Sequence, residues 1–411
     1  MGWHLLDETD RSVAWVEAIF RRARAYQRAF ADERNAAAGR GAWAVAAAPW
    51  TGAAMSAAAG RTVALAFFEP STRTRLSFEL AARRLGADVL DLDVRRSSVV
   101  KGEEERETLL TLEALGAEVI VVRTARDDLR PDAGRLTRAT VVAGGSGMHA
   151  HPTQALLDAY TLLEAFGRLD GSGPLRLSGL TVALVGDVRH SRVAASLLRL
   201  LPRLGARVVV AGPPTLVRRD DGLVPEAAVV PSVEAAVEMA DAVVLLRLQK
   251  ERLSPQDVAA LGGDVDDFLA TYLDRYGLDA RKARRLRPGA VVLHPGPVWP
   301  DVEIARALLD DPRVLVRRQV ENGVFVRMAV LADALGLSGD EQTGAAATPG
   351  ALAAFGEAPG AAKAAGTAPG GITAAGEAPG DPEAAGGADA RAEGEGEAGA
   401  AVDRERAPLY P

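Results

Sequence analysis

The chain has 411 residues, of which 48% are hydrophobic, and this is enough for two domains of about 150 residues each with a further segment. Its net charge is −7 and its arginines are dispersed, so it lacks the basic run that is typical of nucleic-acid binding. It has no cysteine, which excludes disulfides, zinc–thiolate sites and thiol nucleophiles and fits a reducing compartment. No stretch of about 18 apolar residues lacks charge, so we expect no membrane span.

The N-terminal residues predict an amphipathic helix that begins at about Ser12. Acidic residues come early and no uninterrupted apolar segment follows, so we do not expect a signal peptide. Farther along, the continuously apolar residues 62–68 predict a buried strand, and residues 75–87 predict a helix that ends at Gly86 as its C-cap. One face of this helix carries the apolar side chains of Leu76, Leu80 and Ala81.

The segment between that strand and that helix, FEPSTRTRLSFE at residues 68–79, is crowded with hydrogen-bond donors. A helix start already offers unpaired backbone N–H groups and the positive end of the helix dipole. Hydroxyl and guanidinium donors are added there by Ser71, Thr72, Arg73, Thr74 and Arg75, and only Glu69 accepts. Because a simple capped helix needs only one hydroxyl, this pattern predicts a phosphate-binding site.

A second loop places Ser97, Ser98 and Lys101 before Gly102 and an acidic helix start. Taken alone it is weak evidence of a site, because a lysine in such a position is usually exposed to solvent.

Strands and helices then alternate along the chain. Two further strands are predicted at residues 117–123 and 139–145, and four more at residues 180–187, 206–213, 241–247 and 289–297. Helical stretches such as 192–204 and 232–240 lie between them. This alternation predicts an α/β fold with two doubly wound parallel sheets, and in such sheets ligands lie beyond the carboxyl ends of the strands.

The segment HAHPTQALLDAY brings two polar side chains to one helix start. Pro152 suits an early helical position, and His151 and Gln154, three residues apart, share one face of the first turn. A neutral imidazole can donate to a carbonyl oxygen and a glutamine can accept from an amide, so both could address one ligand. His149 and His151 as metal ligands are disfavoured because no further Cys or His cluster accompanies them, and a solvated or core position for His149 stays open.

The sequence GDVRHSRVA follows the predicted strand at 180–187 in the manner of a dinucleotide-binding turn. The G-x-G-x-x-G fingerprint is absent and no acidic residue ends the next strand, which excludes a nicotinamide site. What remains is a strand-end loop with His190, Ser191 and Arg192 at a helix start, and this arrangement suits a carboxylate ligand.

Arg247 and Gln249 directly follow the predicted strand at 241–247. In an extended chain a spacing of two residues points both side chains the same way, and an arginine suits bidentate carboxylate binding. The charged residues that follow, Lys250, Glu251 and Arg252, are typical of an exposed loop.

The C-terminal part, residues 340–411, is rich in alanine, glycine, proline and glutamate. The tetrapeptides ATPG, EAPG, TAPG and EAPG recur every ten residues and end at Gly350, Gly360, Gly370 and Gly380. Almost no large apolar residue is available to offset the entropy of ordering, so we expect a low-complexity disordered tail.

These motifs appear in the order seen in aspartate carbamoyltransferase catalytic chains, and residues 3–336 resemble that family. The motifs STRTR and HPTQ are specific to carbamoyltransferases, whereas RLQKE and HPGP resemble the aspartate branch. The ornithine branch resembles the first half, but it normally carries a cysteine in the segment that matches LHPGP, and this chain has none. The segment Val298-Trp299-Pro300 departs from the pattern, because asparagine and arginine are common after HPGP.

The resemblance implies two doubly wound domains of carbamoyltransferase type. Residues 1–155 would bind carbamoyl phosphate, completed by a late helix at about 318–336 that crosses back to them, and residues 156–317 would bind aspartate. It also implies a homotrimer whose active sites are shared between subunits.

The same resemblance assigns roles residue by residue. The phosphate would be held by Ser71, Thr72, Arg73 and Thr74. The carbamoyl group would be addressed by Arg123, His151 and Gln154, with Arg73 near the bridging oxygen. Aspartate would be held by Arg192, Arg247 and Gln249, with the backbone at Pro295, Gly296 and Pro297. Ser97 and Lys101 would come from the neighbouring subunit, and the catalytic set would be Arg73, Thr74, Lys101, Arg123 and His151.

The activity implied by the resemblance is a cytoplasmic step of de novo pyrimidine (UMP) biosynthesis. The carbamoyl group of carbamoyl phosphate would be transferred to the α-amine of L-aspartate, without a cofactor or metal. Two alternatives stay open: a carbamoyltransferase for another amine such as ornithine, against which Arg247 and Gln249 argue, and a non-catalytic scaffold subunit with the tail as a tether. A regulatory or dihydroorotase-type protein is a candidate partner, and neither nucleic acid nor membrane is expected.

Overall fold

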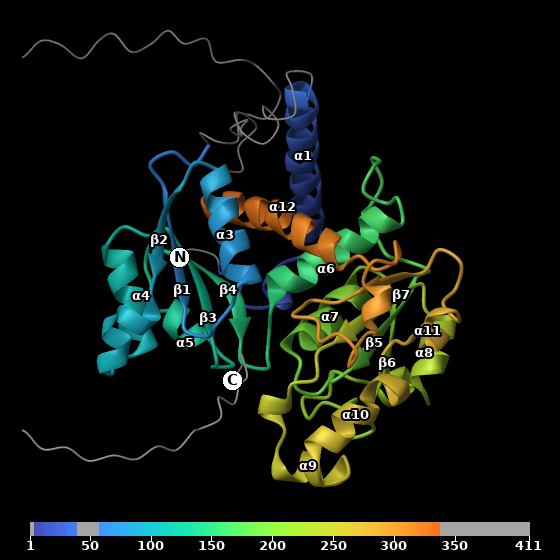
Figure 1. Ribbon diagram of the computed structural model, residues 1–411. Helices are drawn as coiled ribbons and strands as arrows, with labels where there is room; N and C mark the ends of the chain where they lie inside the picture. The colour runs from blue at the N-terminus through green and yellow to red at the C-terminus, as the bar shows by residue number, and fades with distance from the viewer. Residues whose placement is uncertain (1–3, 39–56, 338–411) are drawn as a thin grey trace, which may run out of the picture. The chain divides into compact units, whose positions relative to one another are not determined.

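Two four-stranded sheets, each built of parallel strands, form the framework of the chain (Figure 1). The computed structural model describes residues 4–38 and 57–337, which all belong to one compact unit. The predicted tail at residues 340–411 lies outside the described residues.

The first sheet has the strand order β2-β1-β3-β4. Its strands are β1 (Thr62–Phe67), β2 (Asp88–Leu92), β3 (Val119–Thr124) and β4 (Thr140–Ser146). The runs that predicted β1, β3 and β4 are almost entirely buried, as is typical of parallel sheets covered by helices. The sequence did not predict β2, because DVLDL mixes acidic and apolar residues and lies at the edge of the sheet, where its side chains stay partly exposed.

The second sheet has the equivalent order β6-β5-β7-β8. Its strands are β5 (Thr181–Gly186), β6 (Arg207–Ala211), β7 (Ala242–Leu246) and β8 (Val291–Leu293). All four were predicted from their apolar runs. Strand β8 is shorter than predicted, because the HPGP segment leaves the sheet directly after Leu293.

Helices alternate with these strands. Those of the first half are α1 (Val13–Ala38), α3 (Arg73–Arg84), α4 (Glu105–Ala114), α5 (Arg130–Ala133) and α6 (Pro152–Ala165). Those of the second half are α7 (Arg192–Arg203), α8 (Val233–Met239), α9 (Pro255–Ala260), α10 (Val265–Arg275), α11 (Ala280–Ala283) and α12 (Val316–Ala334). The predicted start of α1 and the predicted bounds of α3, α7 and α8 agree with the observed ones to within a few residues.

The buried face of α3 differs from the face that its leucines indicated. Leu76 and Leu80 are 56% and 41% exposed, whereas Phe78, Ala81 and Ala82 are fully buried. Residues at i, i+3 and i+4 share one side of a helix, so Phe78 with the two alanines defines the face toward the core. The predicted end is confirmed, since Gly86 follows the last turn with φ = 84°.

Helix α12 connects the two halves of the chain. It begins after the second sheet and packs against α1, α3 and α6, and Figure 1 shows it beside these helices. Its residues Phe325, Val326 and Met328 are buried in the same core as the apolar side chains of β1 and α6. The late helix therefore returns to the first half, while the division into domains at residues 155 and 317 stays a prediction.

Candidate active site

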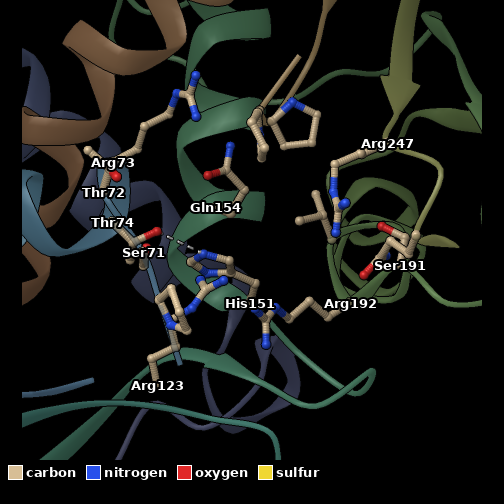
Figure 2. A pocket seen from close by; sticks show the side chains of 16 residues that line it. Ser71, Thr72, Arg73, Thr74, Arg123, His151, Gln154, Ser191, Arg192 and Arg247 are labelled. Carbon is tan, nitrogen blue, oxygen red and sulfur yellow. Dashed lines mark hydrogen bonds between the residues drawn. The ribbon is translucent and has the colours of Figure 1, made fainter. Parts of the chain in front are cut away.

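A cavity of about 320 Å³ lies at the carboxyl ends of strands from both sheets (Figure 2). Its lining consists of residues 70–74, 191–193 and 295–297, together with Arg123, His151, Gln154, Arg247 and Gln249. Each of these positions ends a strand or belongs to the loop or helix start that follows one. The cavity thus occupies the place where parallel α/β sheets bind ligands, and its volume is typical of small-molecule sites.

The turn between β1 and α3 forms one wall of the cavity. Thr72 is the N-cap of α3, yet its side chain makes no capping hydrogen bond, so the helix does not use this hydroxyl. The guanidinium of Arg73 lies against Gly296, where an added Cβ would come within 3.1 Å of Cζ. Gly296 also has φ = 73°, so glycine satisfies both the backbone and the space that Arg73 requires.

Arg75 does not belong to this wall, and its grouping with the phosphate donors was wrong. Its guanidinium pairs with Asp91 of β2, with Nε 2.9 Å from Oδ1, and it does not line the cavity. Side chains two residues apart in a helix are rotated by about 200° around the helix axis. Arg73 and Arg75 therefore cannot both face one ligand from α3.

His151 joins the first wall to the start of α6. It is the N-cap residue of α6 and is buried, with Nε2 3.4 Å from Oγ1 of Thr74. Burial lowers the pKa of His151 well below its usual value, and the charges of Arg123 and Arg192 lower it further. The imidazole is therefore neutral near pH 7, and it can donate one hydrogen bond without carrying a charge.

Two arginines approach each other closely at the floor of the cavity. Burial lowers the pKa of Arg123 to about 9, and the nearby charge of Arg192 contributes to this. A Cβ on Gly145 would lie 3.0 Å from Cζ of Arg192 and 3.2 Å from Nη1 of Arg123, and φ at this glycine is 126°. Glycine therefore permits the approach, which concentrates positive charge where an anionic ligand would bind.

Glu69 partly balances this charge. Its Oε2 accepts from Nη1 of Arg192 at 2.7 Å and lies 3.6 Å from Nε of Arg123. Its Oε1 lies 3.9 Å from Nη2 of Arg252. Glu69 follows β1 of the first sheet, whereas Arg192 and Arg252 follow strands of the second, so these ion pairs link the two halves of the chain beside the cavity.

Arg247 and Gln249 both line the cavity, as their spacing after β7 predicted. Arg247 pairs with Glu251, and Nε2 of Gln249 donates to the carbonyl oxygen of His190 at 2.9 Å. The backbone between them is fixed because Leu248 N donates to the buried carboxylate of Glu303 at 3.1 Å.

Glu303 also holds the loop that follows β8. Nδ1 of His294 accepts from the backbone N–H of Gly296 at 2.9 Å, so Nε2 carries the proton and donates to Oε2 of Glu303 at 3.2 Å. Trp299 N donates to the same oxygen at 2.6 Å. The peptide bond between Gly296 and Pro297 is cis. One carboxylate therefore fixes two of the loops that the second sheet contributes to the cavity, those that follow β7 and β8.

His149 and His190, which the sequence suggested as candidate ligand-binding residues, do not line the cavity. Nε2 of His149 lies 3.3 Å from Oδ2 of Asp7, and its carbonyl oxygen accepts from Arg199 at 2.8 Å, so His149 has a structural role. The prediction that His190 faces a carboxylate ligand is wrong. It is buried with Nδ1 3.1 Å from Oδ1 of Asp187, which takes the place of the ligand.

Ser97 and Lys101 do not line the cavity of their own chain. Ser97 caps the 3₁₀ turn Ser98–Lys101 by accepting from Val99 N, and its hydroxyl donates to Val94 O at 2.9 Å. Lys101 is exposed. The assignment of both residues to a neighbouring subunit stays a prediction.

Glu69, Arg252 and Glu303 help to build the site but were not predicted as binding residues. Glu69 is a carboxylate just before the donors at residues 71–75, and this was a usable signal. Arg252 and Glu303 gave no such signal, because their partners are distant in the sequence and meet only in the fold.

Within residues 4–38 and 57–337, no group of three or more histidines and carboxylates could hold a metal ion. In the same ranges, no helix has the length and apolar character needed to cross a membrane.

Comparison with known proteins assigns the family. The family model described as "Aspartate/ornithine carbamoyltransferase, carbamoyl-P binding domain" matches residues 3–164, and the one described as the "Asp/Orn binding domain" of the same enzymes matches residues 178–333. The aspartate carbamoyltransferase catalytic subunit of Thermus aquaticus is 50% identical over 272 residues, which are 66% of this chain and 84% of that protein. The catalytic subunit of Salinispora tropica is 46% identical over 277 residues, with the same coverage of both chains.

Solved structures agree with this assignment. Aspartate transcarbamoylase of Trypanosoma cruzi in complex with carbamoyl phosphate is 29% identical, with a TM-score of 0.66 over 80% of this chain and 95% of that chain. Ornithine carbamoyltransferase of Thermus thermophilus is 27% identical, with a TM-score of 0.62 over 82% of this chain and 99% of that chain. The two family models together match more than half of the chain, and the two parallel sheets with a cavity between their strand ends agree with them. The chain therefore belongs to the aspartate/ornithine carbamoyltransferase family.

Proposed function

We propose that this protein is an aspartate carbamoyltransferase of pyrimidine (UMP) biosynthesis. It transfers the carbamoyl group of carbamoyl phosphate to the α-amine of L-aspartate, giving N-carbamoyl-L-aspartate and phosphate. The observation that carries the proposal is that the donors at the start of α3 line the same cavity as Arg192, Arg247 and Gln249. Relatives named aspartate carbamoyltransferase catalytic subunit at 46–50% identity support it, as do structures of the Trypanosoma cruzi enzyme in complex with carbamoyl phosphate and aspartate or with carbamoyl aspartate.

The start of α3 binds the phosphate group. The hydroxyls of Ser71, Thr72 and Thr74 and the free backbone N–H groups of the first turn donate hydrogen bonds to its oxygens. Arg73 supplies a fixed cation close to the bridging oxygen, where negative charge builds up as the phosphate leaves.

His151, Arg123 and Thr74 polarise the carbamoyl carbonyl. A neutral imidazole suits this task, since it donates a hydrogen bond to the oxygen and does not surrender a proton to it. Losing one such donor typically slows an acyl-transfer reaction by about 10² to 10³. Gln154 faces the carbamoyl amide from the first turn of the same helix.

Arg192 and Arg247 bind the two carboxylates of aspartate, and Gln249 lies beside them with the backbone of residues 295–297. The α-amine then attacks the carbonyl carbon and the C–O bond to phosphate breaks, with no covalent enzyme intermediate. Among the residues that line the cavity none is placed as a general base, so the departing phosphate takes the proton that the amine loses. Orientation of the two substrates can supply about 7–11 kcal/mol of the rate enhancement.

The active enzyme is a cytoplasmic homotrimer in which Ser97 and Lys101 complete the site of the neighbouring subunit. Both residues lie outside their own chain's cavity, and Lys101 is an exposed residue at the end of the turn that Ser97 caps. A site in the neighbouring subunit would give this lysine a ligand, which supports the assignment.

Ornithine is the alternative acceptor within the family. Its side-chain ammonium would lie among Arg192, Arg247 and Arg252, and this repulsion disfavours it. The test is product formation from carbamoyl phosphate with a panel of amino acids. Aspartate should be the preferred acceptor, and equal or faster reaction with ornithine, or no product with any acceptor, would contradict the proposal.

A further inference from the structure

A chain of three buried hydrogen bonds runs behind the wall of the cavity, from the loop after β8 to Gln154. The backbone N–H of His294 donates to Oε1 of Gln319 at 2.9 Å. Nε2 of Gln319 donates to Oδ1 of Asp158 at 2.7 Å, and Nε2 of Gln154 donates to the same oxygen at 2.9 Å. Asp158 is fully buried and Gln319 is 2% exposed. Neither lines the cavity, and the chemistry described above uses neither of them.

The direction of each bond in this chain is fixed by chemistry. A backbone N–H can only donate, so Gln319 must turn its oxygen toward His294 and its NH₂ group toward Asp158. An ionised carboxylate can only accept, and a protonated one with its proton on Oδ2 still accepts at Oδ1, so Gln154 also turns its NH₂ group toward Asp158. The backbone N–H of His294 thus sets, through the side chains of Gln319 and Asp158, which way the carboxamide of Gln154 is turned.

The carboxamide of Gln154 projects from the first turn of α6 into the cavity (Figure 2). Asp158 lies four residues later, one turn along the same helix and behind the cavity wall. Since the NH₂ group of Gln154 is engaged there, the atom left to face a ligand is Oε1, an acceptor.

We propose that Asp158, anchored by Gln319, is a positioning residue that holds Gln154 with its oxygen toward the substrate and thereby selects an acyl phosphate that carries an NH₂ group. This inference rests on the proposed function. A carbamoyl NH₂ donates to Oε1, whereas an acetyl methyl group of the same size cannot and leaves that buried oxygen unpaired. If the carboxamide were reversed, its NH₂ group would meet the NH₂ of the substrate, and the preference would disappear.

The negative charge of Asp158 is not required for this effect. Burial raises the pKa of Asp158 to about 7, while the hydrogen bonds from Gln319 and Gln154 and the charge of Arg327 oppose that rise. Oδ2 of Asp158 has no hydrogen-bond partner among the described residues, so a proton bound there leaves Oδ1 free to accept both amides. Asparagine offers the same acceptor at Oδ1, which makes it the conservative control.

The experiment uses two unreactive probes and the full-length protein. Phosphonoacetamide replaces the bridging oxygen of carbamoyl phosphate by a methylene group, and acetonylphosphonate differs from it only in a methyl group in place of the NH₂. Isothermal titration gives both dissociation constants for the wild type, Asp158→Asn and Asp158→Leu, with circular dichroism and native mass to verify fold and assembly. Formation of N-carbamoyl-L-aspartate by the wild type is measured separately, so failure of the proposed function is recognised independently.

The wild type should prefer phosphonoacetamide by about tenfold, the worth of one buried hydrogen bond. Asp158→Asn should keep this preference to within about threefold. Asp158→Leu should abolish it through weaker binding of phosphonoacetamide, with acetonylphosphonate binding changed by less than about threefold.

A folded Asp158→Leu protein that keeps the preference would overturn the proposal, as would equal weakening of both probes or a wild type without preference. If Asp158→Leu does not fold, Gln319→Leu tests the same chain from its other end. It should reduce the preference by about threefold, and an unchanged preference in that variant would overturn the anchoring of Asp158 by Gln319.

Discussion

The buried carboxyl of Asp158 should make stability depend on pH in a direction opposite to that of paired surface carboxylates. Its pKa is about 7 in the folded protein, whereas an unfolded aspartate has a pKa of about 3.9. Below about pH 4 the group is protonated in both states and costs nothing. Between about pH 4 and pH 7 the unfolded state releases this proton while the folded state retains it, so the free energy of unfolding falls as pH rises.

The difference of about three pKa units corresponds to at most about 4 kcal/mol, reached above pH 7. Asp158→Asn removes this cost, because asparagine does not ionise. Relative to the wild type, the variant should therefore gain about 2 to 3 kcal/mol in free energy of unfolding between pH 5 and pH 8. A constant offset from the new NH₂ group is the same at every pH and does not affect the comparison.

The assay is urea unfolding followed by circular dichroism at fixed protein concentration, at several pH values from 5 to 8.5. Asp88→Asn, at an exposed position at the start of β2, is measured over the same pH range as the control for the loss of a carboxylate. A difference between the wild type and Asp158→Asn that is flat over this range, or that shrinks as pH rises, would refute the reasoning.

Three further predictions concern the site and the chain outside it. Arg73→Ala should reduce kcat by at least about 10³ while leaving the melting temperature unchanged, and near-normal turnover would contradict the phosphate site. Deletion of residues 340–411 should leave kcat, melting temperature and trimer formation unchanged, because the segment offers almost no large apolar side chains, and a large fall in melting temperature would show that it takes part in the fold. Arg73→Ala and Lys101→Ala proteins should each be nearly inactive but should regain part of the activity when dissociated, mixed and reassembled, because some interfaces then carry neither lesion. Mass-verified hybrids that stay inactive would show that Lys101 does not complete a neighbour's site.

The strands were predictable because each buried strand is a continuous apolar run, and a parallel sheet covered on both faces demands such runs. The edge strand β2 escaped prediction because its acidic residues face solvent. The leucines of α3 led to the wrong buried face for a related reason, since apolar residues do not always lie inside a protein. Only the fold determines that Phe78 with its neighbouring alanines faces the core.

The donors at the cavity were predictable where local geometry decides their direction. His151 with Gln154 at a helix start, and Arg247 with Gln249 after a strand, each face one way because of the period of their element. Arg75 and His190 were misplaced because a carboxylate from another part of the chain, Asp91, or from the same loop, Asp187, binds each of them instead.

The supporting groups could not be predicted, because their partners meet only through tertiary contacts. Glu69 and Glu303 join segments from different strands. Asp158 and Gln319 are separated by 161 residues. Apart from the donors beside Glu69, nothing in their immediate sequence distinguishes these residues from ordinary solvated side chains.

The central claim is that aspartate receives the carbamoyl group, and competition within one reaction tests it most directly. The enzyme is given ¹³C-carbamoyl phosphate with equimolar L-aspartate and L-ornithine, and the labelled products are counted by mass spectrometry. The product ratio equals the ratio of kcat/KM for the two acceptors. The label should appear in N-carbamoyl-L-aspartate with an excess of about 10³ or more over citrulline, whereas comparable label in citrulline, or label in neither product, would contradict the account.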